Sequence, residues 1–245
     1  MRIFSARGPS QLDMISLHSR TAALVLAAAL ATGATAAAGE QRGAANEADR
    51  CRDRAASAVQ SHYEGVRDVS AQFEQMTHGA RLGTTPSAPA TSSGRVSLAK
   101  PGKMRWTYEK PEPSLVVSDG RTVWIYDPAF GEVQKLPASE GFLTGAAAQF
   151  LLGAGDMRRD FKVAATSCSE TAAQLELTPR QPATYEKLVL SVDPKTGNVS
   201  KTRIVDLLGN VVEVAFNDQR VNVSPAASEF QFEVPDGVKV IELAP

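Results

Sequence analysis

The sequence predicts a mainly β protein of the α+β class, built around one antiparallel sheet of about ten to eleven strands. Short segments in which apolar and polar residues alternate fill most of the chain, and turn signals separate them at hairpin spacing. Only two stretches have the character of helices. A net charge of −1 over 245 residues does not favour nucleic acid as a partner.

The N-terminus has the layout of a secretory signal peptide. Arg20 precedes an uncharged, alanine-rich stretch that closes on Ala36 and Ala38 in an A-x-A pattern. Its strongly apolar core is shorter than the ~20 residues of a membrane span, which disfavours an anchor as the alternative. We therefore expect a signal peptide over residues 1–38, with Met14 as a possible true start. A flexible mature N-terminus over 39–48 and one folded domain over 49–245 follow.

The folded domain begins with a helix and a strand. From Asp49 to Tyr63, apolar residues recur every fourth position, and Gly65 ends this amphipathic helix. The next segment, VSAQFEQM, has the strict alternation of a half-buried strand. Residues 79–93 are rich in Gly, Pro, Ser and Thr and predict a mobile loop.

Residues 94–127 are predicted to form the central part of the sheet. Three turn signals divide them into four short strands, and both tryptophans of the protein lie here. Met104, Trp106 and Tyr108 alternate with polar or charged neighbours. The pattern predicts a sheet with one large aromatic face that another part of the chain, or a ligand, must cover.

A segment of different composition interrupts the predicted strands. Residues 138–153 are almost uncharged and alanine-rich, which predicts one or two short helices. Beyond Asp160 we expect strands at FKVAA, QLELTP, YEKLVLSVD, VSKTRIVDL, VVEVAFN and SEFQFEVP, and a short last strand within VPDGVKVIEL.

Nothing in the sequence indicates catalysis. No nucleophile, histidine and acid stand at a recognisable spacing, and there is neither a P-loop nor a zinc-binding motif. We therefore expect no enzyme activity, no catalytic residue, no metal and no cofactor.

The two cysteines, Cys51 and Cys168, are compatible with one disulfide in an exported protein. Two unpaired thiols are the alternative. The residues before Cys51 are charged, which does not suit a lipid-attachment cysteine.

The predicted helices are too small to cover the apolar face of so wide a sheet. Their alanines and glycines permit close approach but add little volume, so a curved sheet under a partial helical lid leaves a cavity for an apolar ligand. The alternative is that the helices seal an ordinary core.

The run SGRVSLAKPGKMRWTYEKPEPSLVVSDGRTVWIYDP resembles the LolA family of periplasmic lipoprotein carriers. The VSAQFEQ strand, the FLLG segment and the terminal FEVPDGVKVI extend the resemblance over nearly the whole mature chain. It implies an incomplete antiparallel β-barrel with a helical lid over an apolar cavity.

The resemblance also implies a location and partners. A monomeric carrier in the periplasm would receive acylated lipoproteins from an inner-membrane ABC-type lipoprotein-releasing complex and pass them to an outer-membrane lipoprotein receptor. A periplasmic lipid- or lipoprotein-sensing regulatory protein of the same fold is the alternative. Such relatives usually carry a second C-terminal domain, which this sequence does not show.

The resemblance suggests lipid-binding residues as well. The candidates for the cavity wall are Met104, Trp106, Tyr108, Trp124 and Tyr126, and those for the lid are Phe142, Leu143, Phe150, Leu151 and Leu152. Ordinary core packing is the competing role for each of them.

Lys100 stands where the family typically has an arginine that bonds lid carbonyls and keeps the empty form closed. Lysine lacks the planar fork of arginine, so we expect a weaker latch. The alternative role is a solvated lysine at a strand end.

Overall fold

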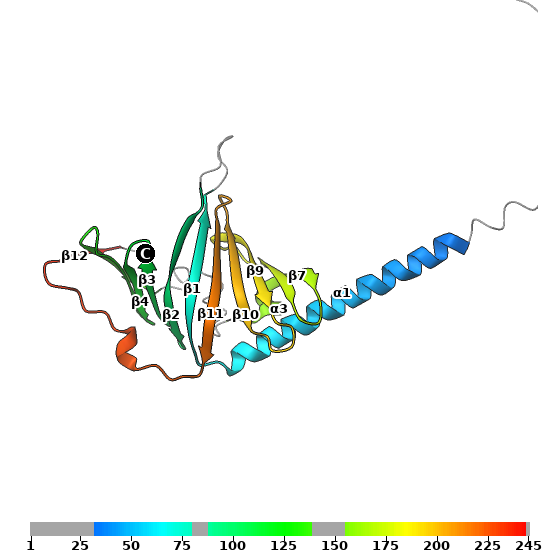
Figure 1. The fold of residues 1–245 in the computed structure, drawn as a ribbon, viewed down its shortest axis with the longest axis horizontal. Helices are drawn as coiled ribbons and strands as arrows, with labels where there is room; N and C mark the ends of the chain where they lie inside the picture. Colours follow the sequence, from blue (N-terminus) through cyan, green and yellow to red (C-terminus); the bar gives the residue numbers. More distant parts are fainter. Residues whose placement is uncertain (1–31, 80–87, 139–154, 244–245) are drawn as a thin grey trace, which may run out of the picture. The chain divides into compact units, whose positions relative to one another are not determined.

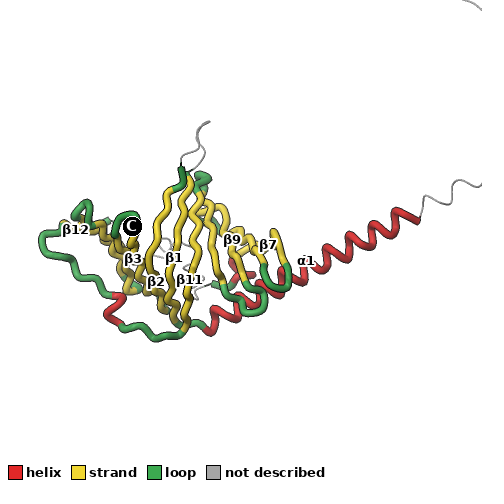
Figure 2. The backbone as a smooth tube through the Cα atoms, viewed as in Figure 1, coloured by secondary structure: helices red, strands yellow, loops and turns green. Residues whose placement is uncertain are grey.

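The computed structural model describes residues 32–79, 88–138 and 155–243, with the backbone alone described for residues 32–45. The chain divides into two units, residues 1–44 and 45–245, and the second contains the sheet. Twelve strands form this sheet in the order β12-β6-β5-β4-β3-β2-β1-β11-β10-β9-β8-β7 (Figures 1 and 2).

The elements follow one another in the chain as helix, six strands, a short helix, five strands, a 3-10 turn and a last strand. Their bounds are α1 Thr32–Gly65, β1 Asp68–His78, β2 Ala90–Ala99, β3 Lys103–Lys110, β4 Ser114–Asp119, β5 Thr122–Asp127, β6 Glu132–Pro137, α3 Met157–Asp160, β7 Phe161–Cys168, β8 Ala173–Pro179, β9 Tyr185–Val192, β10 Val199–Asp206, β11 Val211–Val221, η1 Ala227–Phe230 and β12 Lys239–Glu242. Within the described residues, no helix has both the length and the apolar character needed to cross a membrane.

The sheet is open, because β7 and β12 lie at its two ends and do not pair with each other. This confirms the prediction of a mainly β, incomplete barrel with a helix. Neighbouring strands are antiparallel with one exception: β12 pairs in parallel with β6. A parallel pair needs a long connection, and the chain between β6 and β12 includes all of β7–β11.

Each strand sends alternate side chains to the two faces of the sheet. We call the face that carries Phe73 the inner face. Strand register places Val96, Trp106, Val116 and Ile125 on it, since residues paired across antiparallel strands share a face. In the other half of the sheet, the inner face is leucine-rich, with Leu175, Leu177, Leu188 and Leu190 buried to 1% exposure or less.

The C-terminal half of α1 packs against this leucine-rich half. Ala55, Val59 and Tyr63 are buried at the predicted four-residue spacing and belong to the main core. The contact is close at Gly197 in the β9–β10 turn, where an added Cβ would lie 2.1 Å from the Ala58 carbonyl oxygen. Glycine is required there, also because its φ is +76°.

Polar contacts hold α1 in place along its length. The Tyr63 hydroxyl accepts a hydrogen bond from the Val199 amide at 3.3 Å. The Arg158 guanidinium donates to the carbonyl of Asp53 and the hydroxyl of Ser57, each at 3.0 Å. The helix is therefore anchored both to the sheet and to α3.

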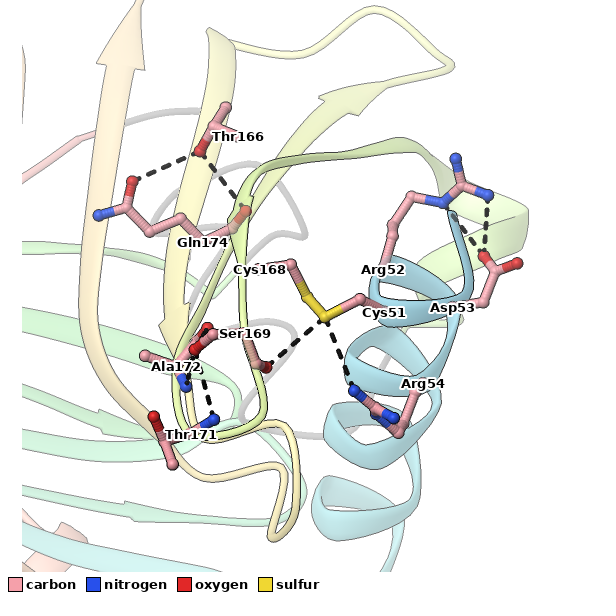
Figure 3. Close-up of a disulfide and its surroundings, with 10 residues drawn as sticks. All are labelled: Cys51, Arg52, Asp53, Arg54, Thr166, Cys168, Ser169, Thr171, Ala172 and Gln174. Atoms are coloured by element: carbon pink, nitrogen blue, oxygen red, sulfur yellow. Dashed lines mark hydrogen bonds and ion pairs between the residues drawn. A yellow bond between two sulfur atoms is a disulfide. The ribbon is translucent and has the colours of Figure 1, made fainter. Parts of the chain in front are cut away.

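A disulfide joins Cys51 of α1 to Cys168 at the end of β7, with their Cα atoms 6.0 Å apart (Figure 3). It ties α1 to the strand at one end of the sheet and closes a loop with a sequence separation of 117 residues.

Residues 39–48 belong to α1, because alanine-rich sequence favours extension of the helix back to Thr32. Their flexibility stays a prediction. Two other parts of the chain differ from expectation. Residues 90–93, predicted to be loop, form the start of β2 by pairing with the end of β1. The predicted strand at SEFQFEVP is instead the η1 turn followed by extended chain that pairs with no strand.

Replacing both cysteines by alanine is expected to lower the free energy of unfolding by about 2–5 kcal/mol, because the reduced chain regains the freedom of a long loop. Guanidinium unfolding of the folded protein measures this. Reduction of the unmodified protein should give the same midpoint as the double variant. An unchanged midpoint in both would contradict a stabilising disulfide.

His62 makes the stability of α1 docking dependent on pH. Its Nε2 atom is buried without a hydrogen-bond partner, and burial lowers the pKa of His62 below its ordinary 6.5. The unfolded chain therefore takes up this proton first, so stability should fall as the pH drops below about 6.5. In His62→Gln, urea unfolding between pH 7.5 and 5 should show a shallower fall; an equal slope would contradict the assignment.

Candidate functional site

Four aromatic rings from three strands meet on the inner face, at the half of the sheet away from the leucine-rich core. Phe73 lies between Trp106 and Tyr108, with ring centroids 4.8 and 5.1 Å apart in edge-to-face geometry. Phe216 on β11 lies 6.3 Å from Trp106. Phe73 is fully buried, whereas Trp106, Tyr108 and Phe216 are only half-buried.

The surroundings of these rings are apolar. Met104 is buried beside them, and a border of half-buried aliphatic side chains extends the surface over neighbouring strands: Val116, Ile125, Leu136, Ile204 and Val212. We call these side chains, together with the four rings, the inner apolar surface. An apolar chain could lie on it by van der Waals contact alone.

At the border of the inner apolar surface, the Tyr108 hydroxyl donates a hydrogen bond to Oε1 of Gln75 at 3.2 Å. Burial raises the pKa of Tyr108, so the phenol stays neutral at physiological pH. In the described part of the chain, no group of three or more His, Cys, Asp or Glu side chains could hold a metal ion.

The structure separates the five residues predicted for one cavity wall. Met104, Trp106 and Tyr108 lie on the inner face, as expected from their alternation. Trp124 and Tyr126 lie on the outer face, because register pairs them with Val117 and Leu115, whose partners on β3 are Arg105 and Thr107. The two groups are on opposite sides of the sheet and cannot form one wall.

The outer face of β3–β6 has its own small core under the C-terminal segment 222–238. The ring of Phe232 lies 5.8 Å from Tyr126 and 6.3 Å from Trp124 between centroids. Val117 and Val133 are completely buried there, and Phe230 almost so. The alternation in SEFQFEVP therefore reflects a segment that lies on a sheet, not one within it.

Hydrogen bonds fix this segment at its start and at η1. The Asp68 carboxylate accepts from the amides of Val223 and Ser224, at 2.6 and 3.2 Å. Further on, Arg105 donates to the carbonyl of Glu229 at 3.0 Å, and Ser97 donates to the Glu229 carboxylate.

The outer face also carries a groove, and its lining is polar where the inner apolar surface is not. A groove of about 660 Å³ runs beside η1, and polar or charged side chains line most of it, among them Gln72, Arg95, Ser97, Arg105 and Glu229. Such a lining does not suit an acyl chain. Of the surfaces described, the inner one fits an apolar ligand.

Lys100 contacts α1. Its ammonium donates to the carbonyl of Tyr63 in the last turn of the helix, at 2.6 Å. Burial lowers the pKa of Lys100, and the nearby Glu64 carboxylate partly opposes this effect. The carbonyls of residues 138–153, expected as its partners, belong to a segment that is almost wholly outside the described residues, so the latch stays a prediction.

The predicted lid residues Phe142, Leu143, Phe150, Leu151 and Leu152 also lie outside the described residues. Sequence reasoning missed Phe73 and Phe216 as members of the site. Their alternation in VSAQF and VVEVAF placed each on one face of its strand but did not show that this face joins Trp106.

Comparison with known proteins agrees with the resemblance seen in the sequence. The family model described as outer membrane lipoprotein carrier protein LolA matches residues 64–233, more than half of the chain. The chain belongs to the LolA family.

Relatives of this LolA-family chain include proteins named outer-membrane lipoprotein carrier protein. The one from Cupriavidus necator is 31% identical over 185 residues, covering 75% of this chain and 86% of the relative. That from Chromobacterium violaceum is 29% identical over 188 residues, covering 76% and 87%.

Solved structures are similar at lower identity. A LolA superfamily protein from Nitrosomonas europaea is 15% identical, with 72% of this chain and 97% of that chain covered and a TM-score of 0.41. The complex of MucA and MucB from Pseudomonas aeruginosa matches at 18% identity, covering 76% and 61%, with a TM-score of 0.38.

Phe232→Ala is expected to expose the outer aromatic core without affecting the inner apolar surface. In a Trp106→Phe background, where Trp124 is the sole tryptophan, its emission should shift to the red. Stability should fall by about 1–2 kcal/mol, as two aromatic contacts are lost. The same substitution with Trp124→Phe in place of Trp106→Phe should leave Trp106 emission unchanged; a shift there would contradict the separation of the two faces.

Proposed function

We propose that this LolA-family protein carries the acyl chains of lipoproteins on its inner apolar surface. The observation that supports this most is the set of half-buried rings that the leucine-rich core and α1 leave accessible. Each methylene removed from water gains about 0.8 kcal/mol, so acyl chains need such a surface to cross an aqueous compartment.

The names of the relatives support the choice of cargo and of route. The proposed route begins at an inner-membrane ABC-type complex that releases acylated lipoproteins and ends at an outer-membrane receptor, with this chain acting as a monomer between them. The signal-peptide pattern of residues 1–38 supports a periplasmic location, with residues 49–245 as the carrier domain. A carrier of this kind needs neither an enzyme activity nor a cofactor.

Individual residues would divide the task. Trp106 and Tyr108 would contact the acyl chains, with Met104 and Phe73 packed beneath and beside them. Phe142, Leu143, Phe150, Leu151 and Leu152 would cover the chains as a lid, and Lys100 would hold the closed form. Trp124 and Tyr126 would support the sheet from its outer face.

The two tryptophans offer a matched pair for the test, because they lie on opposite faces of the sheet, on strands β3 and β5 that only β4 separates. Trp106→Ala should weaken binding of a fluorescent fatty acid about tenfold, the effect of losing part of one aromatic contact area. Trp124→Ala should change the affinity by less than twofold. Titration of the probe into each purified variant measures both.

Native mass spectrometry of the periplasmic protein should detect bound acylated lipoprotein, and less of it in Trp106→Ala. Equal losses of affinity in both variants would place the acyl chains elsewhere. No binding of the probe and no bound lipoprotein in the unmodified protein would overturn the proposed function.

A further inference from the structure

Two turns with unusual side chains lie at the same edge of the sheet. Strands β5, β3, β1 and β10 run in the same direction. In the sheet, one strand lies between each of them and the next, and it is antiparallel to both. The β5–β6 turn, residues 128–131, and the β10–β11 turn, residues 207–210, therefore both lie where these strands end. Figure 1 shows the β10–β11 turn beside the end of β1.

These turns carry the most exposed large hydrophobic side chains of the described residues. Phe130 is 78% exposed, Leu207 68% and Leu208 79%, whereas Val223, the next, is 48% exposed. Turns of this size usually present polar residues. We call Phe130, Leu207 and Leu208 the rim hydrophobics.

The two turns are built alike. An aspartate begins each, and its carboxylate accepts the amide of the second following residue: Asp127 from Ala129 at 2.9 Å, Asp206 from Leu208 at 2.8 Å. A glycine with positive φ ends the apolar part of each, Gly131 at 62° and Gly209 at 85°. Backbone bonds from these glycines to the carbonyls of the aspartates close both turns, so the rim hydrophobics are held outward.

The spacing of the turns indicates what kind of partner they fit. In the strand order, the centres of the β5–β6 and β10–β11 turns are six strand spacings apart, and at about 4.8 Å per spacing this is roughly 30 Å along the curved sheet. A pocket that receives one apolar side chain could not hold both turns. A broad apolar surface could.

We propose that this edge of the sheet rests on a lipid bilayer, with the rim hydrophobics inserted at the boundary between headgroups and acyl chains. Phenylalanine and leucine serve as anchors in that layer, where apolar area leaves water. The aspartates of the turns are engaged with turn amides and stay at headgroup level. The pKa of Asp206 is lowered mainly by its hydrogen bond to Asn210, which keeps its carboxylate ionised.

The proposal goes beyond the proposed function and does not depend on it, because the rim hydrophobics lie in turns outside the strands and none of them belongs to the inner apolar surface. Binding should depend on apolar area, not on charge. It should therefore survive a rise in salt that would screen a basic patch.

Flotation of the purified folded protein with phosphatidylcholine–phosphatidylethanolamine vesicles tests the proposal. The variants are Phe130→Ser, the double Leu207→Ser/Leu208→Ser, and the triple of these. Val223→Ser, at the opposite edge of the sheet, is the matched control. The triple variant should lower the partition coefficient at least tenfold, each partial variant less, and the control less than twofold, in low and high salt alike.

Circular dichroism and the fatty-acid titration accompany each variant. Vesicle binding that is absent in the unmodified protein, unchanged in the triple variant, or abolished by salt would overturn the proposal. So would a parallel loss of fatty-acid affinity in the triple variant, because the rim would then belong to the cargo site. If the unmodified protein binds vesicles through the rim hydrophobics but binds no fatty acid, the proposed membrane contact is supported and the proposed carrier function is overturned.

Discussion

The docking of α1 on the inner face is the contact on which the rest of the structure depends. A sheet of twelve strands has a wide inner face, and α1 is the one long helix of the described residues that packs on it. Its buried side is narrow and made largely of small residues, among them Ala55, Ala56 and Val59. The helix can therefore approach closely but covers only part of the face.

The position of the helix divides the inner face into two halves with different properties. Opposite α1 the strands β8 and β9 carry leucines that are buried away from water. Away from it, β3 and β11 carry aromatic rings that stay half-buried around the buried ring of Phe73 on β1. The disulfide of Cys51 and the close contact at Gly197 hold the helix on the leucine half. Within the described residues, α1 thus leaves the other half of the inner face uncovered.

The aromatic half needs support from elsewhere, since an uncovered sheet surface contributes little burial energy. The C-terminal segment supplies it from the outer face, where η1 contacts β3 and β4 and Phe232 packs against Trp124 and Tyr126. This arrangement stabilises β3–β6 without filling the inner side. The strands beneath the inner apolar surface are thus supported from the outer side.

Alternation and turn residues were enough to predict most strands and the inward position of Trp106 and Tyr108, because both signals are local. They could not predict that Trp124 faces the other way. Which face of β5 joins which face of β3 depends on the register set by the two intervening turns, and one residue of shift reverses it. The parallel pairing of β12 was beyond local signals for the same reason, since it joins residues more than 100 positions apart.

Lys100 connects the two halves of the inner face. It follows β2, next to the aromatic strands, and its ammonium meets the carbonyl end of α1, where the helix dipole favours a cation. One carbonyl at 2.6 Å is the acceptor described, and a lysine, which acts as a point charge, satisfies a single acceptor as well as the fork of an arginine would. The fork would be an advantage only where two acceptors lie side by side. A lysine at this position is therefore sufficient to hold the end of α1, and because an ammonium has three N–H donors, a role in closing a lid would not require Lys100 to leave the Tyr63 carbonyl.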